Sequence, residues 1–157
     1  MASNGIINGT KFGVYSGSTL VAFATSGSIS INHSARETSN KDSLGWKEVM
    51  EGQRDWEISV EGMVAFKDLS GSAVAGLTPD ELYTDGIYDG TGTFPYGRDA
   101  LTISFESSET GDKKWSGSAY LASLSLDAPN EESTTFSASF VGTSILTCLL
   151  YTSPSPR

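Results

Sequence analysis

Residues 55–67, DWEISVEGMVAFK, are the stretch that decides the fold. Apolar side chains occupy one parity of this stretch, interrupted by Gly62, and they are Trp56, Ile58, Val60, Val64 and Phe66. The opposite parity is mainly acidic or polar, with Asp55, Glu57, Ser59, Glu61 and Lys67. Because successive side chains of a strand point to opposite faces, the pattern predicts a long strand with one dry and one acidic face. Gly62 is a candidate for a bulge or a close backbone approach.

Short runs of alternating or apolar residues on both sides predict further strands. Gly17-Ser18 separates two such runs and predicts a hairpin turn. The parity of apolar residues changes within 114–126, which predicts a bulge or a strong bend. The expected strands are Phe12–Ser16, Thr19–Ala24, Ser26–His33 with Ile29 and Ile31 inward, Ala100–Ser107, Lys114–Leu126 and Thr134–Gly142.

One short helix is predicted between the strand at residues 55–67 and the strand at residues 100–107. Thr78 is its expected N-cap, Pro79 stands at the first helical position, and Glu81 can close a capping box. Gly86 is expected to end it. With 157 residues, 17 glycines and many serines and threonines, the chain fits one mainly β domain. We expect a β-sandwich or flattened barrel of seven to nine strands with one short flanking α-helix.

The charge and the residue counts exclude several classes of function. The net charge of −9 makes duplex nucleic acid and anionic membranes poor binding partners. One cysteine and one histidine exclude a disulfide framework, a thiolate zinc site and a two-histidine metal motif. The sequence contains no apolar run that could span a bilayer and no N-terminal secretory pattern. We expect no metal, no cofactor and no membrane partner.

The sequence contains no convincing catalytic constellation. His33 is the single histidine that could activate a serine, and we interpret it as a strand-end surface residue. Glu57 and Glu61 lie four residues apart on one strand face, about 13 Å along the strand, which is far for a glycosidase pair. We therefore predict no catalytic residues and no enzymatic activity.

The segment SARETSNKDS, residues 34–43, has one alanine and otherwise only polar residues. It is too polar for a core strand and has no helical stripe, so it predicts a long exposed loop that is mobile in the isolated chain. Trp46 follows it and is expected to hold its end against the body.

The acidic face of the strand predicted at residues 55–67 has three possible surroundings. Asp55, Glu57 and Glu61 must face solvent, a channel or a neighbouring subunit. At an interface, Arg54, Lys67 or Lys47 would have to answer their charge.

The end of the chain departs from the pattern before it. Residues 145–151 are apolar without alternation, and a Pro- and Ser-rich tail follows. We place the main domain at residues 1–143, and the sequence leaves open whether residues 144–157 are native. Cys148 lies in this segment and is assigned no role.

Separated blocks of the sequence resemble the major tail protein of long non-contractile-tailed bacteriophages. The blocks are AFATSGSISIN at 22–32, RETSNKDSLGW at 36–46, GQRDWEISVEG at 52–62, and SGSAYLASLSLDAPNEESTTFSASFVG at 116–142. They are collinear and, with the residues between the first three, cover 68 of the 157 residues. Residues 143–157 depart from the closing strand that is usual in this family.

This resemblance implies a structural protein of the virion tail, assembled in the host cytoplasm. Six copies would form a ring and the rings would stack into a tube that conducts DNA without binding it. The tape measure, tail terminator and distal tail proteins are the implied partners. The loop at residues 34–44 would reach a neighbouring subunit, which makes Arg36, Glu37, Lys41 and Asp42 candidate contact residues, and Asp55, Glu57 and Glu61 candidates for the channel wall. Two alternatives remain open: a type VI secretion or pyocin-like tube protein, and a carbohydrate-binding sandwich using Trp46, Trp56 and Trp115.

Overall fold

The computed structural model describes residues 5–21, 24–65, 76–87, 100–109 and 111–150. In these ranges it contains eight strands and one α-helix, so the predicted mainly β fold is confirmed. The strands are β1 (Phe12–Ser16), β2 (Thr19–Leu20), β3 (Ala24–Glu37), β4 (Val49–Met63), β5 (Leu101–Ser107), β6 (Lys113–Asp127), β7 (Thr135–Gly142) and β8 (Thr147–Leu150). The helix α1 spans Pro79–Gly86, and two short 3-10 turns lie at Gly9–Lys11 and Lys41–Ser43.

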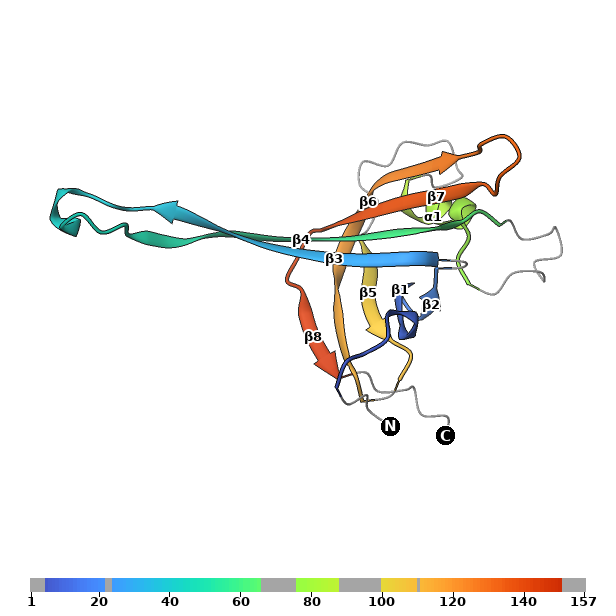
Figure 1. The fold of residues 1–157 in the computed structure, drawn as a ribbon, viewed down its shortest axis with the longest axis horizontal. Coiled ribbons are helices and arrows are strands. Elements are labelled where there is room, and N and C mark those ends of the chain that lie inside the picture. The colour runs from blue at the N-terminus through green and yellow to red at the C-terminus, as the bar shows by residue number, and fades with distance from the viewer. Residues whose placement is uncertain (1–4, 22–23, 66–75, 88–99, 110, 151–157) are drawn as a thin grey trace.

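The strands form one antiparallel sheet in the order β2-β1-β5-β6-β7-β4-β3, with β8 paired to β6. The sheet curls so that β3 packs across β1 and β5. A Cβ at Gly27 of β3 would lie 3.2 Å from the Val14 side chain of β1 and 3.5 Å from that of Phe105 of β5. The resulting body is a flattened barrel, and α1 lies against β6, where Leu82 is buried (Figure 1).

The expected alternation along β4 is confirmed. Trp56, Ile58 and Val60 are buried, whereas Asp55, Glu57 and Glu61 are exposed. The strand begins earlier than predicted, at Val49, and Lys67 and Phe66 lie outside the described residues. An irregularity in the β3–β4 register lies beside Gly62, because Ala24 pairs with Gly62 and Ser26 with Glu61. The extra residue, Thr25, belongs to β3.

The parity change predicted in β6 is also present as a register shift against β7, between Leu121 and Ser123. The bulge lets one long strand serve two environments. Its first half pairs with β5 and β8, and its second half pairs with β7.

Two burial predictions for β3 and its surroundings are wrong. Ile31 is 59% exposed, although it was expected inward with Ile29, because it lies on the edge strand β3 next to the start of the hairpin, where fewer strands are present to cover it. Trp46 is 80% exposed and does not hold the following chain against the body. No helix of the described chain is long and apolar enough to cross a membrane.

The indole of Trp56 is the largest buried side chain of the core cluster. It occupies space beside Gly117 of β6 and Gly142 of β7, where any Cβ would collide with the ring. Its Nε1 donates a hydrogen bond of 2.8 Å to the Ser144 carbonyl. Leu146 also packs against the core, so the described part of the C-terminal segment is attached to the body.

Replacing Trp56 by alanine should lower the free energy of unfolding by about 3–5 kcal/mol, as removal of a large core side chain does. The exposed Trp46 provides the matched control, and Trp46→Ala should change that free energy by less than about 0.5 kcal/mol. Urea unfolding followed by far-UV circular dichroism measures both. Equal effects of the two substitutions would contradict the placement of Trp56.

Candidate assembly surfaces

The outer halves of β3 and β4 form a hairpin that projects far beyond the body (Figure 1). Beyond Asn32 and Asp55, these two strands have only each other as hydrogen-bonded neighbours. We call residues 33–54 the arm and residues 38–48 its tip. The sequence predicted a loop over 34–43, but residues 34–37 belong to β3, with Arg36 opposite Met50 and Glu37 opposite Val49. Polar residues can form these strands because both faces of the arm meet solvent.

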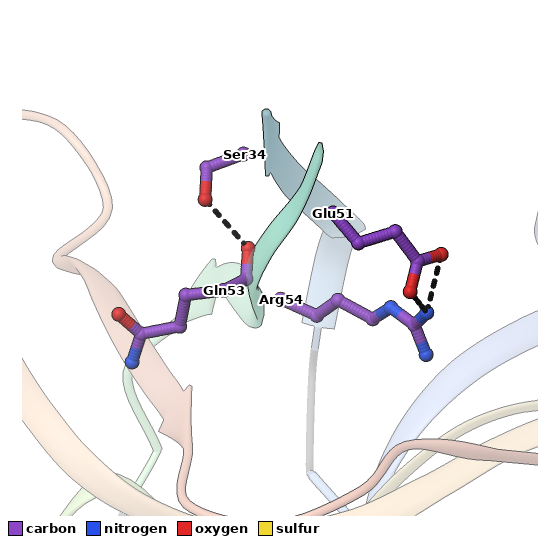
Figure 2. A network of polar contacts seen from close by, with 4 residues as sticks. All are labelled: Ser34, Glu51, Gln53 and Arg54. Atoms are coloured by element: carbon purple, nitrogen blue, oxygen red, sulfur yellow. Dashed lines mark hydrogen bonds and ion pairs between the residues drawn. The ribbon is translucent and has the colours of Figure 1, made fainter. Parts of the chain in front are cut away.

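A bulge sets the course of the arm where it leaves the body. His33 pairs with Arg54 and Ala35 with Glu51, so β4 uses one residue more than β3 over this interval. The Ser34 hydroxyl donates to the Gln53 carbonyl at 3.0 Å (Figure 2). The Arg54 guanidinium donates to both carboxylate oxygens of Glu51 at 2.9 Å, also in Figure 2.

Gly52 is required at this bulge for steric reasons. A Cβ on Gly52 would lie 2.6 Å from the carbonyl oxygen of Ser34 and would also collide with its hydroxyl oxygen. The backbone oxygen cannot move aside without disturbing the pairing of the two strands.

The tip is an ordered turn with its own hydrogen bonds. The Asn40 side chain accepts from the Asp42 amide at 2.8 Å, and the Asn40 amide donates to the Ser43 hydroxyl at 3.1 Å. Ser39 closes the base, because its hydroxyl accepts from the Glu48 amide at 2.8 Å. Leu44 and Gly45 have positive φ angles of 49° and 82° and turn the chain back. These bonds define the conformation of the tip in the structure, and the mobility predicted for the isolated chain stays a prediction.

The tip exposes two large apolar side chains that sequence reasoning did not select as contact residues. Leu44 is 87% exposed, and Trp46 follows it after Gly45. The predicted contact residues Arg36, Glu37, Lys41 and Asp42 are exposed on the arm and its tip. An apolar pair inside an otherwise polar segment was the available signal, but Trp46 was interpreted as an anchor to the body.

The second surface is the outer face of β3, β4, β7 and β6 within the body. Its rows cross the four strands in register, for example Ser30, Glu57, Val141 and Tyr120, then Ser28, Ser59, Ser139 and Ser123. We call it the serine face, and its residues are Ser26, Ser28, Ser30, Asn32, Asp55, Glu57, Ser59, Glu61, Met63, Tyr120, Ser123, Ser125, Asp127, Thr135, Ser137, Ser139 and Val141.

Short hydroxyl side chains make hydrogen bonds across the strands of the serine face. Ser28 and Ser59 hydroxyls lie 2.9 Å apart, and those of Ser125 and Ser137 lie 2.6 Å apart. Glu57 accepts a hydrogen bond from the Ser139 hydroxyl, and Glu61 accepts one of 3.4 Å from Ser26. The face as defined has acidic but no basic side chains.

The structure places the three predicted acids together and separates them from two of the three candidate cations, Arg54 and Lys47. Asp55, Glu57 and Glu61 lie along one strand of the serine face, and Asp127 adds a fourth acid at its edge. Arg54 is already paired with Glu51, and Lys47 lies at the tip of the arm. Lys67 lies outside the described residues. The three tryptophans share no surface, since Trp56 is buried, Trp46 is on the tip, and Trp115 packs near Phe12 and Phe105.

The fold is that of tail tube proteins from phages and related particles. A tail structure of an empty gene transfer agent particle with C6 symmetry aligns with a TM-score of 0.66 and 18% identity, covering 90% of this chain and 98% of that chain. The SPP1 tail tube aligns with a TM-score of 0.60 and 12% identity, covering 93% and 80%. The sheath/tube terminator structure of the PVC extracellular contractile injection system aligns at 0.64 and 14%, covering 93% and 98%.

The family model described as phage tail tube protein matches residues 11–81. This match confirms the resemblance predicted from the sequence, and it includes β1 to β4 and the start of α1. No curated protein matches the sequence significantly. The family and the structural neighbours are tail components and not enzymes, in agreement with the predicted lack of catalytic activity.

Replacing Gly52 by alanine should disturb the arm and leave the body intact. The added methyl group must push β3 and β4 apart at Ser34, so amide hydrogens at residues 34–54 should exchange at least about tenfold faster. Exchange at residues 56–62 should stay unchanged. Gly9→Ala is the control, because a Cβ there meets nothing within 4 Å and φ is not in the left-handed region. Unchanged exchange in the arm would contradict the steric role of Gly52.

Proposed function

We propose that this protein is a tail tube subunit of a phage or phage-like particle. Six copies form a ring, rings stack into a tube in the virion tail, and DNA passes through the channel. The observation that carries the proposal is the arm, which extends from a body with the tail tube fold and whose strands, among the described residues, pair only with each other (Figure 1). A long exposed hairpin of this kind is useful to a protein that contacts further copies. The C6 symmetry of the similar gene transfer agent tail supports six copies.

We further propose that the serine face lines the channel. In the part of the chain that the structure describes, its acids have no cationic partner on that face, so burial against another protein surface would be costly unless the neighbour supplied bases. Short hydroxyl side chains leave a smooth wall, and carboxylates repel phosphates and prevent adhesion of the passing DNA. The outer tube surface is the competing position for the same face.

The remaining partners follow from the same proposal. Assembly takes place in the host cytoplasm, and a tape measure, a tail terminator and a distal tail protein contact the tube along its length or at its ends. A type VI or pyocin-like tube protein is the second candidate, favoured by the similarity to a contractile injection system. A carbohydrate-binding module is a weaker candidate, because the three tryptophans do not form one platform.

Negative-stain electron microscopy of the concentrated protein tests the tube directly. Tubes of uniform width with six-fold end views are expected from the full chain. Binding to immobilised sugars without any assembly would instead support the carbohydrate-binding alternative.

Removing the arm should abolish tubes without unfolding the body. Since His33 and Arg54 are paired, residues 34–53 can be replaced by an Asn-Gly turn that closes the shortened hairpin. The shortened protein should keep the melting temperature within a few degrees, because the deleted residues lie outside the core. Normal tubes from this variant would show that the arm is not an assembly contact.

Charge reversal tests the channel wall in an assembling phage. Tails carrying Glu57→Lys and Glu61→Lys should still form, but DNA should adhere to the basic wall and leave more slowly, most strongly at low salt. Glu131→Lys and Glu132→Lys in the β6–β7 connection give the control, with the same change in net charge away from the serine face. Normal ejection at low salt from tails with the first pair would place the serine face elsewhere.

A further inference from the structure

An apolar groove lies between α1 and the second half of β6. It has a volume of about 360 Å³ and is lined by Pro79, Asp80, Tyr83, Ile87, Leu124 and Leu126. Tyr83, Ile87 and Leu126 are each about half exposed, and Leu124 forms part of the floor towards the core. Exposed apolar side chains gathered in one groove are typical of an interaction surface.

The tip of the arm has the complementary chemistry. Leu44 and Trp46 are the most exposed large apolar side chains of the arm, and the tip hydrogen bonds hold the turn that presents them. A fixed shape lowers the entropy lost on docking. Ordered tryptophan side chains are also enriched among residues that dominate binding.

Charge favours the same pairing. Residues 34–54 carry four bases and four acids, so the whole excess of negative charge belongs to the rest of the chain. Lys47 follows Trp46 at the tip, whereas Asp80 lines the groove. Two bodies repel each other because both are negatively charged. The tip has no net charge and an exposed lysine, so it can approach the acidic body of a second copy without this repulsion.

The tip cannot reach the groove of its own chain. The arm extends from the body on one side, and α1 lies at the opposite end of the long axis (Figure 1). The bulge at Ser34 and Gln53 keeps the hairpin on that course. A contact between tip and groove must therefore join two different copies, and each copy keeps one free tip and one free groove.

We propose that the groove between α1 and β6 receives Leu44 and Trp46 of a second copy. This contact rests on the proposed tube function and identifies the receiving surface. It joins unlike surfaces of identical chains, so it can repeat from copy to copy without closing on a pair. Each contact is small, but six parallel contacts between two rings act together because the first one holds the others in reach.

Mixing two defective variants tests the pairing. The tip variant carries Leu44→Ser and Trp46→Ser, and the groove variant carries Ile87→Asp and Leu126→Asp. The tip variant retains a working groove and the groove variant retains a working tip. Neither variant should form tubes alone, and an equal mixture should stop at pairs of rings or of subunits, because a pair has no further matching surfaces.

The controls separate this contact from folding and from the proposed function. Ile6→Asp and Ile145→Ser change exposed apolar side chains outside both surfaces and should leave tube length unchanged. Circular dichroism should show the full-chain spectrum for every variant. Electron microscopy and sedimentation velocity measure the assemblies of each protein and of the mixture.

The outcomes are distinguishable. Tubes of normal length from either variant alone, or long tubes from the mixture, would overturn the tip–groove contact and leave the tube function standing. The tip–groove contact would also be overturned if the two folded variants failed to pair when mixed. Absence of tubes from the unmodified chain would overturn the tube function itself.

Discussion

The burial of one side of β4 determines the rest of the molecule. Trp56, Ile58 and Val60 must face the core, and because side chains alternate along a strand, Glu57 and Glu61 must face away from it. The same strand pairs with β7 inside the body and continues outward with β3 as the arm. One register therefore sets the core, the composition of the serine face and the direction of the arm.

Alternation along the sequence was sufficient to predict the strands that pack on the core. It located β4 and the bulge in β6, and the capping residues located the start of α1. Apolar periodicity and capping residues are both local signals in the sequence. It did not predict the strand pairing of residues 34–37, because a hairpin exposed on both faces needs no apolar side. The prediction that Trp46 packs against the body was wrong, because the tip of the arm lies away from the core and Trp46 is exposed there. The role of the serine face in a channel stays a prediction.

The groove between α1 and β6 could not be derived from the sequence at all. Its residues come from 79–87 and 124–126, and they meet only because the helix returns to cross β6, where a Cβ on Gly86 would collide with Leu121. Apolar side chains at Tyr83, Ile87 and Leu126 are unremarkable one by one. They form a candidate docking groove only because the fold brings them together, and the exposed Leu44 and Trp46 at the tip of the arm provide the apolar side chains that could fill it.

The continuity of β4 from tip to core also defines how the subunit can carry a load. Hydrogen bonds between antiparallel strands run perpendicular to the strands. A pull on the tip along the arm would draw β3 and β4 outward together, so it would load the bonds of β4 to β7 in parallel and not one after another. The buried indole of Trp56 fills the space beside Gly117 and Gly142, so it opposes sliding of β4 along β7. The subunit is thus built to resist stretching along the arm more strongly than peeling of β3 from its free edge.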